Sequence, residues 1–250
     1  MEGSSRERFA RLPPEEQARY RLAGQQMARF AEAHAVPIIF GPPAWFGGEV
    51  RGATGCVVQL RSQFFVITAS HVLKGYESLA QDDPTAVWQV GQYRFEPVSR
   101  IAWRDHKVDV VLLELSASEA SSVGTSVASA PYGWPPPAPS KGHLVLISGY
   151  PKSLRQTDSP GRVGSGAIST LLEVGPAGDS YFYCEIQRGE LISFNEEPVP
   201  PEDTDYGGWS GSPVFLVRNL AYPLVGIVSE FQGSLGLLRV AALAAIRFPT

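Results

Sequence analysis

Three short segments of the chain contain the residue types that a serine nucleophile requires. The segment GGWSGSP (207–213) places Ser210 in a glycine-rich turn, ITASH (67–71) ends on His71, and VDVVL (108–112) carries Asp109 ahead of an apolar run. A serine hydroxyl is a poor nucleophile near neutral pH unless a base lies beside it and a third group orients that base. Each segment alone is also typical of a surface loop or a strand end, so only the combination favours catalysis.

The chain from residue 50 onward has the pattern of short β-strands that would position these residues. Apolar and β-branched runs recur between turn signals without intervening helical periodicity, which predicts a barrel or a sandwich. The 21 prolines and 25 glycines also fit many short strands better than a helical bundle. The predicted strands are 56–60, 64–68, 86–90, 108–115, 143–148, 181–186, 214–217 and 224–228.

Three further segments frame these strands. Residues 14–34 begin with proline and acidic residues and continue with apolar residues at helical spacing, which predicts a helix. Its apolar stripe would either dock on the body of the protein or bind a partner. The proline-rich segment 130–139 predicts a crossover between two β halves, because proline cannot join a central ladder. A short helix is expected at 241–247.

Composition limits the classes of function. A hydrophobic content of 44% predicts a folded domain, and a formal charge of −4 gives no reason to expect nucleic-acid binding. The apolar run 64–69 is far shorter than the roughly 20 residues that span a bilayer, and residues 1–29 lack the apolar core of a signal peptide. Cys56 and Cys184 fit a reducing compartment, although they could form one bridge. We therefore expect a cytoplasmic protein that binds neither nucleic acid nor membrane.

The three segments, in the order His71, Asp109, Ser210, resemble those of the trypsin-like serine peptidases of the chymotrypsin fold. α/β-Hydrolases and subtilisins arrange the same residue types in other orders. The strand LVGIVS (224–229) is similar to the one that borders the substrate cleft in that family. The resemblance implies an all-β fold of two six-stranded antiparallel β-barrels, with an added N-terminal helix and a short C-terminal helix.

The same resemblance implies a division of the chain. Residues 1–40 would form a helical extension and residues 41–250 the peptidase domain, with barrels at about 41–130 and about 140–250.

A mechanism also follows from the resemblance. The protein would hydrolyse peptide bonds of a protein or peptide substrate through an acyl-enzyme at Ser210. His71 would act as the general base, and Asp109 would hold its tautomer. The backbone N–H groups of Gly208 and Ser210 would form the oxyanion hole. No cofactor and no metal are implied.

Two departures from secreted relatives concern activation and disulfide bonding. Those relatives have an aspartate immediately before the nucleophile, which pairs with a new N-terminal amine after zymogen cleavage, whereas this chain has Trp209. An indole cannot make that ion pair, so the chain is more similar to bacterial and intracellular members. The usual partner position of Cys56 in a disulfide is Val72, which excludes that bridge.

The specificity pocket admits two interpretations. The resemblance puts Thr204 near the pocket floor, and it puts Glu230 and Phe231 on the wall just after Ser229. Phe231 would narrow the pocket and favour a small residue at P1, on the acyl side of the scissile bond. Asp205 or Glu230 would instead attract a basic P1 residue.

Two hypotheses on function stay open. One is an active serine endopeptidase, and the other is a catalytically silent peptidase-like module that binds polypeptides. The acidic segment 195–205 is either a solvated loop or a regulatory lid that an activating protein partner would order. The presence of His71, Asp109, Gly208 and Ser210 together favours the peptidase, since a binding module needs none of them.

Overall fold

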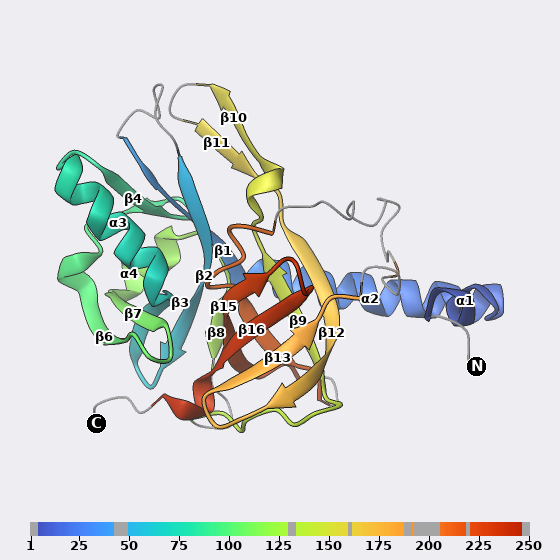
Figure 1. Cartoon of the computed structure of the whole chain (residues 1–250). Helices are drawn as coiled ribbons and strands as arrows, with labels where there is room; N and C mark the ends of the chain where they lie inside the picture. Colours follow the sequence, from blue (N-terminus) through green and yellow to red (C-terminus); the bar gives the residue numbers. More distant parts are fainter. Residues whose placement is uncertain are drawn as a thin grey trace.

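The computed structural model describes residues 5–42, 50–129, 134–159, 162–187, 192, 206–218 and 221–246. These residues form two β units that lie side by side, with helices on their outer surfaces (Figure 1). The expected all-β fold with an N-terminal helix is confirmed.

The N-terminal segment forms helices α1 (Ser5–Ala10) and α2 (Pro14–His34), which confirms the predicted helix. Proline at the start of α2 and two acidic residues in its first turn suit a helix N-terminus. The apolar stripe packs on the body, where the ring of Phe30 lies 5.1 Å from that of Phe215. None of the helices in the described residues has both the length and the apolar character needed to cross a bilayer.

The first β unit is an eight-stranded sheet rather than the expected six-stranded barrel. Seven strands follow the order β5-β4-β1-β2-β3-β7-β6, and β8 pairs with β2 in parallel. Since β1 pairs with β2 and β4, residues 35–41 belong to this sheet, and the helical part of the N-terminal segment ends at His34. The strands are β1 (Ala35–Gly41), β2 (Arg51–Leu60), β3 (Gln63–Ala69), β4 (Val87–Val90), β5 (Tyr93–Arg94), β6 (Ile101–Asp105), β7 (Val110–Leu115) and β8 (Val127–Ser129).

Two helices and a turn accompany this sheet: α3 (Ser70–Asp82), α4 (Ala117–Ser122) and the 3-10 turn η1 (Val98–Arg100). The sequence analysis missed α3, although Val72, Leu73 and Tyr76 are buried at helical spacing along it. Ser116 caps α4 and exchanges hydrogen bonds with Glu119.

The second β unit is a closed six-stranded barrel in the order β12-β13-β16-β15-β14-β9, as predicted. The hairpin β10–β11 projects from it at the top of Figure 1, after the 3-10 turn η2 (Lys152–Leu154). The strands are β9 (Leu144–Gly149), β10 (Arg155–Ser159), β11 (Arg162–Ser165), β12 (Ile168–Ala177), β13 (Tyr181–Glu185), β14 (Pro213–Leu216), β15 (Leu224–Gln232) and β16 (Leu237–Ala242).

The chain end differs from the helix expected at 241–247. Ala241 and Ala242 belong to β16, and only the 3-10 turn η4 (Leu243–Ala245) follows within the described residues. Pairing of β16 with β13 and β15 overrides the helix propensity of this alanine-rich run.

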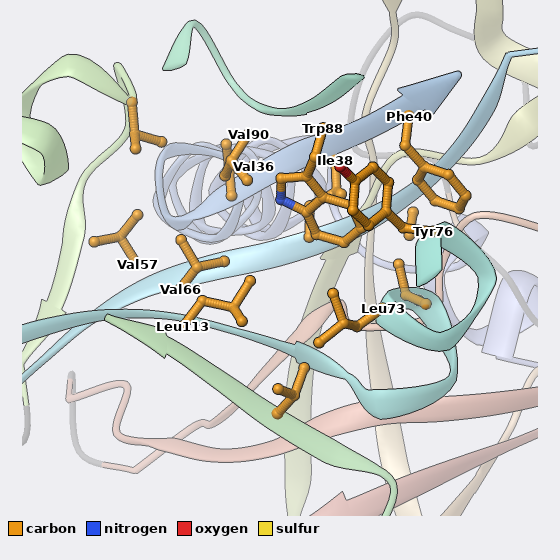
Figure 2. Close-up of a cluster of buried hydrophobic side chains, with 14 of the residues drawn as sticks. Val36, Ile38, Phe40, Val57, Val66, Leu73, Tyr76, Trp88, Val90 and Leu113 are labelled. Carbon is orange, nitrogen blue, oxygen red and sulfur yellow. The ribbon is translucent and has the colours of Figure 1, made fainter. Parts of the chain in front are cut away.

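Three apolar clusters form the core, one within each β unit and one between the two units. One lies in the first unit, where Trp88 stacks on Phe40 and meets the edge of Tyr76 (Figure 2). A second fills the barrel, and a third joins the two units through residues such as Ile67 of β3 and Ile227 of β15. This shared cluster fixes the two halves at the junction where the three sequence motifs meet. Cys56 and Cys184 are both buried free thiols, so they form no bridge.

Candidate active site

The histidine and the aspartate lie next to the ends of two neighbouring strands of the first unit. His71 is in the first turn of α3, directly after β3, and Asp109 immediately precedes β7, which pairs with β3. Asp109 has a φ of +59°, a left-handed conformation that aspartate tolerates better than most residues. Its carbonyl accepts a hydrogen bond of 3.1 Å from the N–H of Ser70, which ties the two turns together.

Both carboxylate oxygens of Asp109 contact His71. Oδ2 lies 2.8 Å from Nδ1 of the imidazole, and Oδ1 accepts a bond of 2.9 Å from the His71 backbone N–H. These two bonds fix the orientation of the ring and favour the tautomer that carries its proton on Nδ1. The carboxylate is 14% exposed and the imidazole 49% exposed, so the far ring nitrogen is accessible.

A third bond to this carboxylate comes from the second unit. The Ser229 hydroxyl donates to Asp109 Oδ2 at 3.0 Å, and Arg239 Nη2 donates to Ser229 Oγ at 3.0 Å. Burial raises the pKa of Asp109, but hydrogen bonds and charge attraction from His71, with the bond from Ser229, outweigh it and lower the pKa overall. Asp109 is therefore ionised near neutral pH.

The contacts of Ser229 and Arg239 were missed in the sequence. The sequence predicts Ser229 only on the substrate-binding strand and predicts no role for Arg239. Their meeting depends on the pairing of β15 with β16, which shifts at a bulge between Val228 and Glu230. No motif in the sequence encodes such a register.

The nucleophile turn before β14 is held from both units. Thr54 of β2 donates its N–H to the Ser210 carbonyl at 3.0 Å and its hydroxyl to the Gly208 carbonyl at 2.8 Å. The Gly211 N–H donates to the Val228 carbonyl of β15 at 2.7 Å. Ser210 is thus fixed between the first unit and the barrel, although Thr54 was not among the predicted site residues.

Two glycines are required for the shape of this turn. Gly208 and Gly211 have φ values of +100° and +87°, which residues with a Cβ rarely adopt. A Cβ at Gly208 would lie 2.6 Å from the Tyr150 carbonyl oxygen, and one at Gly211 would overlap the Thr54 carbonyl. In the described residues, neither the Gly208 nor the Ser210 N–H donates to another backbone group. Both amides can therefore serve a developing oxyanion.

Among the described residues, the Ser210 hydroxyl makes no hydrogen bond to the His71 ring. The ring of His71 bonds to Asp109 through Nδ1. Bonds between a nucleophile and its base are often long or misaligned before substrate binds and tighten in the reacting complex.

Trp209 anchors the turn through packing rather than through charge. The indole is 1% exposed and lies 4.8 Å from the ring of Tyr206, in the apolar cluster of the barrel. Its backbone N–H also donates to the Tyr206 carbonyl at 3.1 Å. The residue that replaces the aspartate of secreted relatives is thus part of the core.

A second polar network connects α3, the helix that carries His71, to the neighbouring strand β6. The buried Ser70 hydroxyl accepts a bond of 2.9 Å from Arg104 Nε and lies 3.2 Å from His106 Nδ1. The other nitrogens of Arg104 donate to both carboxylate oxygens of Glu77 on α3, at 2.6 and 3.0 Å. These bonds tie the helix that carries His71 to strand β6. Among the described residues, no group of three His, Cys, Asp or Glu side chains could hold a metal ion.

The predicted specificity residues are described in part. Phe231 packs against Tyr206, with ring centroids 5.0 Å apart, and Glu230 lies 3.5 Å from Arg239 across the strand pair. Thr204 and Asp205 lie outside the described residues, as does the rest of the acidic segment 195–205.

Residues 53–227 match the trypsin-like peptidase domain family, and the chain belongs to this family. Its fold is similar to that of the Rv3671c protease from M. tuberculosis in its active form, at 17% identity, 88% coverage of this chain, 81% of that chain and a TM-score of 0.53. It is also similar to the thermostable serine protease AL20 from an extremophilic microorganism, at 14% identity, 85% and 93% coverage and a TM-score of 0.51. No curated protein matches the sequence significantly.

Proposed function

We propose that this chain is a serine endopeptidase in which His71, Asp109 and Ser210 form the catalytic triad. The observation that carries the proposal is the pair of bonds from His71 to Asp109, at 2.8 and 2.9 Å, together with a turn at Ser210 in which Gly208 and Gly211 have positive φ values. Membership of the trypsin-like peptidase domain family supports the same reaction. The substrate would be a protein or a peptide.

The first half of the reaction would form an acyl-enzyme. Ser210 Oγ attacks the carbonyl carbon of the scissile bond while Nε2 of His71 takes the hydroxyl proton. The carbonyl oxygen becomes an oxyanion that accepts hydrogen bonds from the N–H groups of Gly208 and Ser210. The C–N bond then breaks, and the imidazolium of His71 gives its proton to the leaving amine. The ionised Asp109 stabilises that imidazolium throughout.

The second half would regenerate the enzyme. A water molecule gives one proton to Nε2 of His71 and attacks the ester carbonyl. The ester C–O bond breaks, Ser210 recovers its proton from His71, and the product leaves with a new carboxylate. The alternative function, a silent polypeptide-binding module, would need no such proton transfer.

Control of activity would not use a new N-terminus, because a buried indole occupies the position of the ion-pairing aspartate. We keep the hypothesis that segment 195–205 acts as a lid ordered by a protein partner. Full activity of the purified chain on an unfolded polypeptide, with no partner added, would contradict this hypothesis.

We infer that the pocket prefers a small P1 residue. Phe231 packs on Tyr206 at the wall, which leaves less room for a large side chain. Glu230 lies 3.5 Å from Arg239, so its charge is partly compensated and attracts a basic P1 residue less.

Cleavage of a peptide library, mapped by mass spectrometry, tests both the function and this preference. We expect cuts after Gly, Ala and Ser, and no cuts by Ser210→Ala. Phe231→Gly should raise kcat/KM for a large P1 residue by about 10- to 100-fold, because the wall opens. Glu230→Gln is the matched control and should leave the preference unchanged. Loss of cleavage after Lys and Arg in Glu230→Gln would instead support a basic pocket.

A further inference from the structure

Arg155, the first residue of β10, lies beside the nucleophile turn. Its Nη1 donates to the Val50 carbonyl at 3.1 Å, just before β2 begins. A Cβ at Gly208 would lie 3.4 Å from Arg155 Nη2, and one at Gly52 would lie 2.5 Å from its Cζ. The guanidinium therefore occupies the space that two glycines leave open, one from each β unit. Figure 1 shows the hairpin β10–β11 beside the start of β2.

Among the described residues, the Arg155 guanidinium has no carboxylate partner, unlike three other partly buried arginines. Arg104, Arg100 and Arg239 each lie within 4 Å of a glutamate, at 2.6, 2.9 and 3.5 Å. Among the described residues, the hydrogen bond of Arg155 goes to the Val50 carbonyl, which uses one of its five N–H donors.

The charge is also partly withdrawn from water. Arg155 is half-buried, and burial lowers the pKa of its guanidinium. Removing a charge from water is unfavourable unless an opposite charge compensates for it. A carboxylate is the natural counterpart, because the planar guanidinium can donate two parallel hydrogen bonds to it.

We propose that Arg155 is a specificity residue that binds a carboxylate of the polypeptide substrate beside the oxyanion hole. The proposal rests on the proposed function for the nature of the ligand. Since Arg155 Nη2 comes within 3.4 Å of the Cβ position of Gly208, whose N–H faces the oxyanion, the carboxylate lies close to the scissile bond. An extended chain advances about 3.3 Å per residue, which places the acidic group within two or three residues of that bond. An acidic side chain and a C-terminal carboxylate both satisfy this chemistry.

Peptide binding to the Ser210→Ala chain tests the proposal without requiring catalysis. The probes are fluorescent heptapeptides in which one Asp moves through seven positions of a small neutral sequence, each paired with its Asn counterpart. Binding to the C-terminal carboxylate is tested with a neutral peptide that has a free C-terminus and with the same peptide amidated at its C-terminus. Fluorescence anisotropy measures each Kd. We expect Asp at one position, or the free C-terminus, to bind about 10- to 100-fold more tightly than its neutral counterpart.

Two variants on the Ser210→Ala background separate charge from placement. Arg155→Met should reduce the ratio of the two Kd values, neutral peptide over acidic peptide, to about one. Gly52→Ala keeps every charge, but its new Cβ displaces the flexible end of Arg155, so it should reduce the ratio as well. Arg19→Met, an exposed arginine on α2, removes the same charge and should leave the ratio unchanged.

Either of two results would overturn the proposal. One is an equal affinity for Asp and Asn at every position together with equal affinity for the free and amidated C-termini. The other is an acidic preference that persists in Arg155→Met. Neither result would bear on catalysis, which is measured separately by comparing hydrolysis in the wild-type and Ser210→Ala chains.

Discussion

His71→Ala is expected to lower kcat for peptide hydrolysis by about a million-fold. Without the imidazole, Ser210 has no group to accept its proton, and the leaving amine has none to supply one. The bonds from His71 to Asp109, at 2.8 Å from the ring and 2.9 Å from the backbone N–H, orient the imidazole for the proposed role of general base. The measurement is single-substrate kinetics on an internally quenched peptide chosen from the library above.

The double variant His71→Ala/Ser210→Ala provides the strictest control for that result. Residues that act as one unit give strongly non-additive losses, so the double variant should be no slower than either single variant. His143→Ala, an exposed histidine whose Nδ1 accepts a bond from the Ser140 N–H, should leave kcat nearly unchanged. Losses that add in the double variant would contradict a shared role.

Asp109→Asn is expected to lower kcat by about ten-thousand-fold at neutral pH. The asparagine can keep the geometry, but its amide group favours the wrong imidazole tautomer and cannot stabilise the imidazolium. With the amide nitrogen in the place of Oδ2, beside Nδ1 of His71, it can donate its second hydrogen to Ser229 Oγ, and the amide oxygen can still accept from the His71 backbone N–H, so the turn should remain folded. Asp105→Asn is the matched control, because its carboxylate accepts bonds from two backbone amides away from the imidazole.

The same substitution should change the acid stability of the protein. The pKa of Asp109 is lower in the folded chain than its ordinary value, so its interactions stabilise the fold above about pH 4. This stabilisation is lost as pH falls from there through the folded-state pKa. Urea midpoints measured between pH 6 and pH 2.5 should fall less steeply with acid in Asp109→Asn than in wild type. Identical slopes, or a loss of kcat smaller than tenfold, would contradict the role of this carboxylate.

The site elements that could be predicted are those whose local sequence encodes a strand followed by a turn. The apolar run that ends in ITASH predicts β3 and the turn that carries His71, and the apolar run after Asp109 predicts β7. The positive φ values of Gly208 and Gly211 agree with a glycine-rich turn, because few other residues adopt them. Six strands of the barrel include four whose apolar runs were visible in the sequence, β9, β13, β14 and β15.

The features that could not be predicted depend on contacts between distant segments. β5 and β8 have two and three residues, too few to show alternation, and β8 is defined by its parallel pairing with β2. Ser229 reaches Asp109 only because β15 and β16 pair with a bulge. Arg155 lies 53 residues before Gly208 in the sequence, and no short motif connects them. Propensity and periodicity carry no information on such long-range placement.

Labelling with a fluorophosphonate probe tests most directly whether Ser210 is an activated nucleophile. The probe phosphonylates a serine that has a working base and oxyanion hole, and mass spectrometry of the digested chain locates the adduct. We predict one adduct, on Ser210, in the folded wild-type chain, and none there in Ser210→Ala or in His71→Ala. A folded wild-type chain that carries no adduct on Ser210, even with an unfolded polypeptide present, would contradict the account and favour a module that binds polypeptides without cutting them.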